Sequence, residues 1–292
     1  MFKRKQMSSE EIHKNRWIIL AIVVLLPFMA SLDSNIVNIA LPTIETELRI
    51  NMASAEWIVS IYLIIISATI LLFGRIGDMK SKTLVFINGI LVFTIGSFLC
   101  GISGNIYLLV ASRVVQAIGA ALVMSTNQGI ITAIFSAEER GKALGVTGAA
   151  VALGALIGPG LGGIIITYLT WHYIFLINVP IGVVAYILAR KYIPVEVLKT
   201  TEKIDGKGVL TFFISIVFIF SAIMIGQQIG FSDIYIVCGF IIGFFAFAVF
   251  VYIEKKAKSP MLDLSLFKNL TFTINLIGAC ISFIAINTVS II

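Results

Sequence analysis

Long apolar segments alternate with short polar connections along the whole chain. Each apolar segment is about as long as an α-helix that crosses the roughly 30 Å hydrocarbon core of a bilayer. This pattern predicts nine transmembrane helices, at residues 17–39, 57–77, 83–103, 106–127, 142–166, 171–190, 209–228, 233–253 and 271–292. We therefore expect an all-α integral membrane protein that crosses the bilayer several times.

The basic residues are distributed unevenly between these connections. All but two of the 21 lysines and arginines lie in the N-terminal tail or around the even-numbered connections; the exceptions are Arg49 and Arg113. Cytoplasmic loops retain lysine and arginine, so the asymmetry predicts a cytoplasmic N-terminus. The same asymmetry accounts for the net charge of +6. It favours the lipid bilayer, rather than nucleic acid, as the partner of these charges.

Two charged connections divide the chain. The expected organisation is a cytoplasmic tail at 1–16, a six-helix unit at 17–190, a cytoplasmic connection at 191–208, two further helices at 209–253, a cytoplasmic loop at 254–270 and a last helix at 271–292. That last segment ends at Ile292 without a polar or basic flank. We interpret the chain as the N-terminal portion of a longer protein.

Two ionisable residues lie deep within predicted helices. Asp33 is the only acidic one, and Arg113, at a comparable depth, is the only basic one. An ionisable side chain in hydrocarbon is costly, so each is a candidate functional residue. Burial would favour the protonated form of Asp33, which is the property that a proton carrier needs. The alternatives are an aspartate whose side chain reaches outer water, and an arginine that binds backbone carbonyls.

A glycine-rich run occupies the fifth predicted helix. Gly154 and Gly158 are four residues apart, so they share a helix face and allow a neighbouring backbone to approach closely. Pro159 removes a backbone donor and is expected to bend the helix. Taken alone, the run indicates a tight helix crossing.

Five segments resemble motifs of the major facilitator superfamily, in the same order along the chain. They are 32–42, similar to the first-helix signature of the 14-span drug:proton antiporters (the EmrB/QacA branch), 74–82, similar to the loop motif between helices two and three, 113–121, similar to the fourth-helix motif, 154–163, similar to the antiporter motif, and 171–182, similar to the entry to helix six. Met79 and Ser81 replace the arginine and glycine that are usual in the loop motif. The additional helix pair at 209–253 is what distinguishes 14-span from 12-span members.

The resemblance implies both a fold and an activity. The fold would be a six-helix N-terminal bundle, two linker helices and the first helix of a truncated second bundle. The activity would be proton-coupled antiport by alternating access, exporting lipophilic or cationic drugs from a cell. The protein would lie in the cell membrane. The proton gradient would drive its transport, and no cofactor or metal would be needed.

The resemblance also assigns roles to particular residues. Proton coupling would involve Asp33, Arg113 and Gln116; a conformational latch would involve Gly74, Arg75, Gly77, Asp78 and Lys82; the antiporter motif contributes Gly154, Gly158, Pro159, Gly162 and Gly163. Weaker candidates for binding the substrate are Asn35, Asn38, Trp57, Tyr62 and Asn127. Ordinary helix packing is the alternative for these five residues.

Three other functions remain as alternatives. One is a major facilitator exporter that is specific for a metabolite. Another is a non-transporting fragment or scaffold, because a C-terminal half is missing; a separately encoded C-terminal half would then be a partner. A membrane enzyme is disfavoured, since the sequence has no nucleophile–base pair, no metal-ligand spacing and no phosphate-binding loop.

Overall fold

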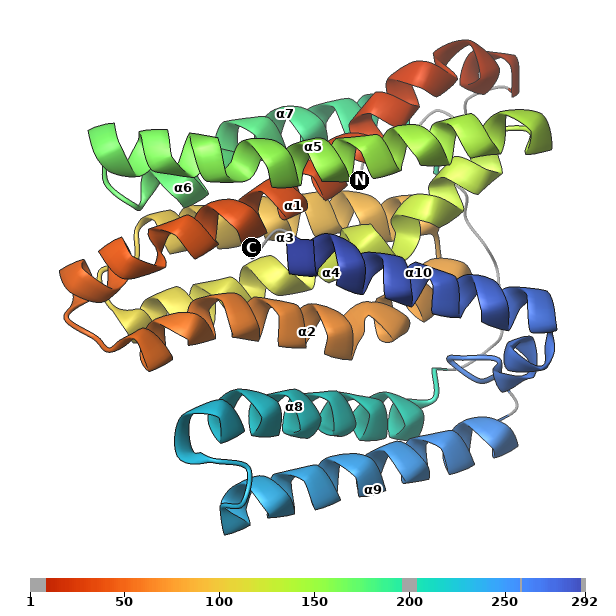
Figure 1. The fold of residues 1–292 in the computed structure, drawn as a ribbon. Coiled ribbons are helices and arrows are strands. Elements are labelled where there is room, and N and C mark those ends of the chain that lie inside the picture. The colour runs from red at the N-terminus through yellow and green to blue at the C-terminus, as the bar shows by residue number, and fades with distance from the viewer. Residues whose placement is uncertain (1–8, 196–203, 258, 290–292) are drawn as a thin grey trace.

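The computed structural model describes residues 9–195, 204–257 and 259–289, and these ranges contain helices but no strand (Figure 1). The helices are α1 (Ser9–Leu48), α2 (Met52–Met79), α3 (Lys82–Gly101), α4 (Ile106–Ile134), α5 (Ala137–Tyr168), α6 (Tyr173–Leu176), α7 (Asn178–Tyr192), α8 (Gly206–Ile229), α9 (Ile234–Lys256), a short 3₁₀ helix (Leu264–Lys268) and α10 (Leu270–Val289). The prediction of an all-helical chain is confirmed for this part of the molecule.

Eight helical stretches are long and apolar enough to cross a membrane, when α6 and α7 are counted together. They match the first eight predicted segments in order. The ninth, 271–292, falls on α10, whose apolar stretch within the described residues runs only from Leu270 to Ser282. This ninth crossing stays a prediction.

Two of the predicted segments differ in detail from the helices of the structure. The first helix was expected at 17–39 but extends from Ser9 to Leu48. Hydropathy identifies only the apolar part of a helix, and here residues on both sides of that part continue the same helix. The segment 171–190 contains a break at Ile177, between the short α6 and α7. This break places Asn178 at the beginning of α7.

Polar side chains fix where three of the helices begin. Asn51, Ser81 and Asn105 each have extended backbone and precede α2, α3 and α4. Their side-chain oxygens accept hydrogen bonds from the backbone nitrogens of Ser54, Leu84 and Leu108, respectively, three residues later. Each cap satisfies a backbone donor that has no partner within the helix.

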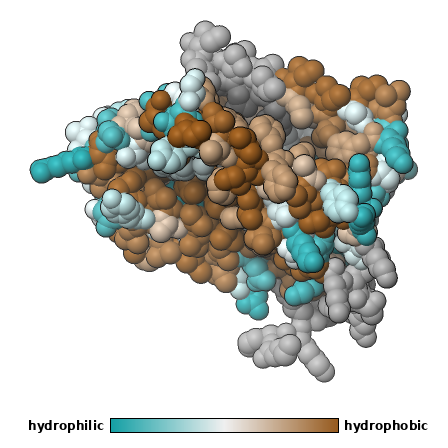
Figure 2. Space-filling model, turned by 90° about the horizontal axis from the view of Figure 1, so that it is seen from below, coloured by the Kyte–Doolittle hydropathy of each residue, from teal (hydrophilic) through white to brown (hydrophobic). Residues whose placement is uncertain are grey.

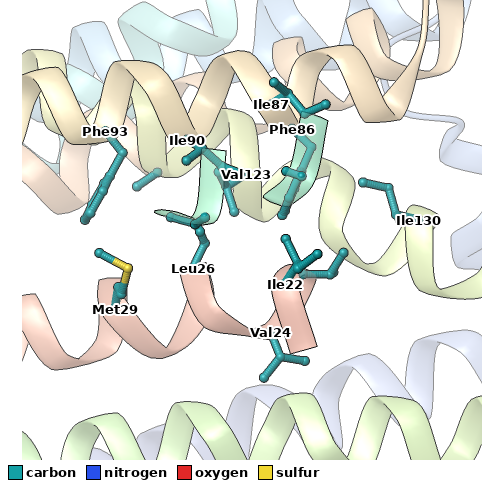
Figure 3. Close-up of a cluster of buried hydrophobic side chains, with 14 of the residues drawn as sticks. Ile22, Val24, Leu26, Met29, Phe86, Ile87, Ile90, Phe93, Val123 and Ile130 are labelled. Atoms are coloured by element: carbon teal, nitrogen blue, oxygen red, sulfur yellow. The ribbon is translucent and has the colours of Figure 1, made fainter. Parts of the chain in front are cut away.

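The centre of the packing lies among α1, α3 and α4. Figure 3 shows part of this cluster, with Ile22, Leu26 and Met29 of α1, Phe86, Ile90 and Phe93 of α3, and Val123 of α4. Glycines let α3 and α4 approach backbone to backbone: a Cβ at Gly96 would overlap the backbone of Gln116, and one at Gly119 that of Phe93. Small residues at such crossings are typical of membrane helices.

The pair α8 and α9 lies beside α2, on the opposite side of the molecule from α5 and α7 (Figure 1). Ser60 Oγ of α2 lies 3.2 Å from Met224 Sδ of α8, and Gln228 Nε2 donates to the Ala53 carbonyl at 3.4 Å. These contacts attach the pair to the rest of the chain.

Large apolar side chains are exposed on the outer surface. Leu156 of α5 is 77% exposed and Phe245 of α9 is 71% exposed. Figure 2 shows apolar residues over much of the face that it presents, with hydrophilic residues gathered toward the edges. Such a surface suits surrounding lipid rather than water.

Candidate functional site

A buried ion pair joins α1 to α4. Arg113 Nη1 lies 2.6 Å from Asp33 Oδ2, and both side chains are fully buried. The two ionisable residues that the sequence placed deep in predicted helices are therefore in direct contact. Asp33 does not reach outer water, so the alternative of an aspartate that extends to solvent is wrong.

Two amides complete the hydrogen bonding of the carboxylate. Gln116 Nε2 and Asn178 Nδ2 each donate to Asp33 Oδ1 at 2.9 Å. Gln116 also donates to Ser97 Oγ at 2.9 Å and accepts from Arg113 Nη1 at 2.7 Å. All of these side chains are buried. The result is a buried polar cluster, which we call the Asp33 network: Asp33, Ser97, Arg113, Gln116 and Asn178.

Arg113 is held by the backbone as well as by the carboxylate. Its Nε donates to the Ile58 carbonyl of α2 at 2.9 Å. Its guanidinium carbon lies 4.1 Å from the ring centre of Tyr62, a cation–π distance. The arginine therefore makes the backbone contact expected of a structural arginine and also an ion pair with Asp33, the other buried ionisable candidate.

The local sequence explains how five helices meet at this point. Gln116 follows Arg113 by three residues, so both lie on one face of α4. The backbone contact at Gly96 brings α3, with Ser97, against Gln116. The break before α7 brings Asn178 to the same place from the other side.

The electrostatics of the network suit a site that changes its charge. An ionised carboxylate and a guanidinium together are neutral, so the pair can be buried when its hydrogen bonds are satisfied. Adding one proton to Asp33 would leave a buried positive charge on Arg113. A change in the net charge of this buried pair would therefore have a large effect on the energy of the surrounding helices.

Sequence reasoning missed Ser97 and Asn178 as members of this site. Both are polar residues inside long apolar segments, and that property was the available signal. Asn178 lies 145 residues from its partner Asp33, and Ser97 lies 19 residues from its partner Gln116, on another helix. Spacing along the chain alone does not indicate such contacts.

The glycines of the antiporter motif divide between two faces of α5. A Cβ at Gly154 would lie 2.6 Å from the Phe28 carbonyl oxygen, and one at Gly158 would lie 2.8 Å from Asn35 Cβ. Gly162 is also close to α1, with Ile36 Cα 3.4 Å from such an atom. The expected close helix crossing is therefore present, and its partner is α1.

Two residues of that motif do not take part in the crossing. Pro159 is exposed, and a Cβ added at Gly163 would meet nothing within 4 Å. The helix also continues through Pro159 from Ala137 to Tyr168, so the proline does not end it. Gly154, Gly158 and Gly162 therefore face α1, whereas positions 159 and 163 fall on the open face of α5.

Gly158→Leu is expected to destabilise the chain strongly, whereas Gly163→Leu is expected to leave its stability unchanged or slightly increased. The first side chain would force α5 away from α1 at a backbone contact, costing at least the roughly 1–3 kcal/mol of an overpacked core. The second enters open space and replaces a poor helix former. Thermal unfolding of the two purified variants in the same lipid measures the difference. Equal melting temperatures would contradict the placement of Gly158 on the face of α5 that contacts α1 and of Gly163 on the open face.

The loop motif contains an exposed ion pair. Asp78 Oδ1 lies 2.9 Å from Lys82 Nζ, one helical turn apart along the chain, and both side chains are more than a third exposed. A Cβ at Gly77 would lie 2.8 Å from the Thr126 methyl carbon of α4, whereas at Gly74 the nearest atom of Ser125 is 3.8 Å away. The close approach of α4 therefore involves Gly77 and not Gly74. Arg75 is half-buried at the same end of α2.

Asp78→Asn is expected to change the stability of the chain by no more than roughly 1 kcal/mol, because exposed ion pairs contribute little. If the pair acts as a conformational latch, the same variant should nevertheless lose most of its transport. Thermal unfolding and transport by one preparation separate the two effects. Normal transport by a normally folded variant would remove Asp78 from the latch.

The five candidate substrate-binding residues differ in burial and in their contacts. Tyr62 is buried against Arg113, and Asn127 is buried with no hydrogen-bond partner for its Oδ1 among the described residues. Asn35 donates to the Ser31 carbonyl of its own helix at 2.8 Å. Asn38 is exposed, and Trp57 is half-buried. Of the five, Tyr62 alone has a recorded contact with the Asp33 network.

Comparison with known proteins agrees with this architecture. The chain is 40% identical over 273 residues to the "Riboflavin transporter RibZ" of Clostridioides difficile, covering 91% of this chain and 58% of that protein. It is 32% identical to the "Multidrug efflux pump SdrM" of Staphylococcus aureus and 30% identical to the "Multidrug transporter protein MdtP" of Bacillus subtilis, covering 82% and 94% of this chain and 53% and 51% of those proteins.

A solved structure shows the same fold. The crystal structure of the peptide transporter POT in complex with sulfate superimposes with a TM-score of 0.60 at 15% identity, covering 82% of this chain and 52% of that one. The chain thus spans about half the length of the relatives that it matches. The family model described as the Major Facilitator Superfamily matches residues 23–290. The chain therefore belongs to the major facilitator superfamily of membrane transporters.

Proposed function

We propose that this chain is part of a proton-coupled antiporter that exports lipophilic or cationic compounds. The observation that carries the proposal is the Asp33 network, in which a single carboxylate is buried against a single guanidinium. A membrane transporter that couples to protons needs a group whose charge changes inside the helices. Asp33 has the surroundings for that role, and Arg113 and Gln116 contact it directly.

The mechanism follows from competition for one negative charge. A proton on Asp33 and a cationic substrate near Asp33 would each compensate that charge, so the two would bind alternately. The transmembrane potential favours any exchange that moves net positive charge inward. Rocking of two helix bundles about a site near the middle of the membrane would expose Asp33 to each side in turn.

The finer assignments belong to the same proposal. The chain would be the N-terminal portion of a 14-span transporter of the EmrB/QacA branch, in the cell membrane, with the N-terminus in the cytoplasm. The helix pair α8 and α9 would be the two linker helices, and α10 the first helix of a second bundle. The similarity to multidrug transporters supports export of several unrelated compounds.

A second candidate is transport of one metabolite. The relative that is 40% identical is named a riboflavin transporter, and riboflavin is an aromatic, uncharged compound rather than a cation. In that case the Asp33 network would still bind the proton, but the substrate would not compete for the same charge.

Because rocking needs two helix bundles, the test uses the complete transporter of which this chain would be the N-terminal portion, purified and reconstituted in proteoliposomes. We expect an imposed inward proton gradient to drive the export of a lipophilic cationic dye, and collapse of the gradient to stop it. Movement of riboflavin but not of the dye would favour the metabolite transporter. Movement of neither under a verified gradient would contradict both and favour a non-transporting scaffold.

A further inference from the structure

Asn178 occupies an unusual position in the Asp33 network. It is fully buried at the first residue of α7, directly after the break that follows α6. Its Nδ2 donates to Asp33 Oδ1 at 2.9 Å. Its Oδ1, in contrast, has no hydrogen-bond partner among the described residues.

Gln116 donates to the same carboxylate oxygen, but both the nitrogen and the oxygen of its amide have partners. Its Nε2 donates to both Asp33 Oδ1 and Ser97 Oγ, and its Oε1 accepts from Arg113 Nη1 at 2.7 Å. Rotating this amide by half a turn would break the bond to Arg113 and place two donors against each other. Asn178 can rotate without losing any bond apart from the one to Asp33.

The two protonation states of Asp33 require opposite partners. An ionised carboxylate only accepts hydrogen bonds, whereas a protonated carboxyl group also donates one. Oδ2 faces the guanidinium of Arg113, so the proton is expected on Oδ1, which faces the two amides. A protonated Oδ1 would confront the Nδ2 donor of Asn178 until that amide turned its oxygen inward.

We propose that Asn178 is the positioning residue that responds to protonation of Asp33, by rotating its side-chain amide half a turn so that its Oδ1 accepts the new proton. In the ionised state Nδ2 donates to the carboxylate, and in the protonated state the carboxyl O–H donates to Asn178 Oδ1. This rests on the proposed function only in taking Asp33 as the group that binds the proton.

Rotation of the amide, rather than displacement of the helix, is the response that the packing allows. A Cβ at Gly182, one turn after Asn178, would overlap Thr94 of α3, so the start of α7 is pressed against its neighbour. A side-chain rotation needs no movement of that contact. The unpartnered Oδ1 is then explained as an acceptor that is used in only one of the two states.

The other ionisable groups around Asp33 are Arg113 of α4, Tyr62 of α2 and Cys100 of α3. Arginine, tyrosine and cysteine side chains ordinarily titrate above neutral pH. The described residues of α6 and α7 bring no ionisable side chain with a recorded contact to Asp33. A carboxyl signal that appears on acidification can therefore be assigned to Asp33 once the Asp33→Asn variant lacks it.

The test is infrared difference spectroscopy of the purified protein in lipid nanodiscs, recorded between high and low pH. In the unsubstituted protein we expect a carboxyl C=O band from Asp33 to appear together with a change in an asparagine amide band. Asn178→Leu should lose the amide change. It should also raise the pH of half-protonation by about one unit, a tenfold change in proton affinity, because the hydrogen bond that the ionised carboxylate loses is stronger than the neutral one that the protonated form loses.

Two further variants make the result specific. Asn178→Ser keeps a hydroxyl that can donate or accept, so it should restore the original midpoint without the amide band, even if Asn178→Leu folds poorly. Asn88→Leu removes an exposed amide elsewhere on α3 and should change neither signal. An unchanged amide band and an unchanged midpoint in Asn178→Leu would overturn the role of Asn178 alone. A missing Asp33 carboxyl band in the unsubstituted protein would overturn this inference together with the proposed function.

Discussion

Asp33→Asn is expected to abolish proton-driven transport while leaving membrane insertion intact. Asparagine has nearly the same shape as aspartate, but it cannot take up and release a proton in the physiological range. Without that step, protons and substrate no longer compete for one charge, and the gradient cannot drive export. Proton flux and substrate flux measured together in proteoliposomes test this, and we expect the coupled fraction to fall to background.

A control must exclude that Asp33→Asn loses coupled transport only because the protein is destabilised. Asp33→Asn also leaves Arg113 buried without its counter-ion, which by itself destabilises the protein. The double variant Asp33→Asn/Arg113→Gln removes both charges and should fold better than the single variant, yet remain uncoupled. Coupled transport by either variant would show that the proton is bound elsewhere.

Arg113→Leu is expected to produce the largest loss of stability, about 3–5 kcal/mol, because it leaves a buried carboxylate without its partner. The Ile58 carbonyl loses its bond to Arg113 Nε in the same change. Arg113→Lys keeps the charge but has no second nitrogen for the Ile58 carbonyl, so its loss should be intermediate. Thermal or denaturant unfolding in one defined lipid or detergent gives the order of the three proteins.

The neutral double variant is again the informative control. If the cost of Arg113→Leu comes from the unpaired charge of Asp33, the further change Asp33→Asn should recover part of the lost stability. Equal stabilities of Arg113→Leu and Asp33→Asn/Arg113→Leu would show that the contacts with Tyr62 and the Ile58 carbonyl, rather than the charge, are what Arg113 contributes.

The sequence predicted the helices and the two charged residues of the site well, because each leaves a local signal. An apolar segment of about 20 residues identifies a crossing without knowledge of its neighbours. Asp33 and Arg113 were conspicuous as ionisable residues among apolar ones. Their contact at 2.6 Å, however, depends on how α1 and α4 pack, and their common depth in the membrane was the only sign of it.

The features that the sequence did not predict depend on contacts between distant helices. Asn178 joins the network only because the chain breaks before α7, a break that apolar composition does not reveal. The face of α5 that meets α1 includes Gly158 but not Gly163, and only the helix orientation decides this. The docking of α8 on α2 through Met224 likewise has no local sequence signal.

Proton release on substrate binding tests the central claim most directly. The purified protein in a weakly buffered solution is titrated with a lipophilic cation at several pH values. If the cation and the proton compete for Asp33, binding of the cation should release protons. At pH values below the midpoint for protonation of Asp33, the affinity for the cation should then rise by up to tenfold for each unit by which the pH is raised. Asp33→Asn should bind the cation without releasing protons. Release by Asp33→Asn equal to that of the unsubstituted protein, or binding without release by the unsubstituted protein, would contradict the account.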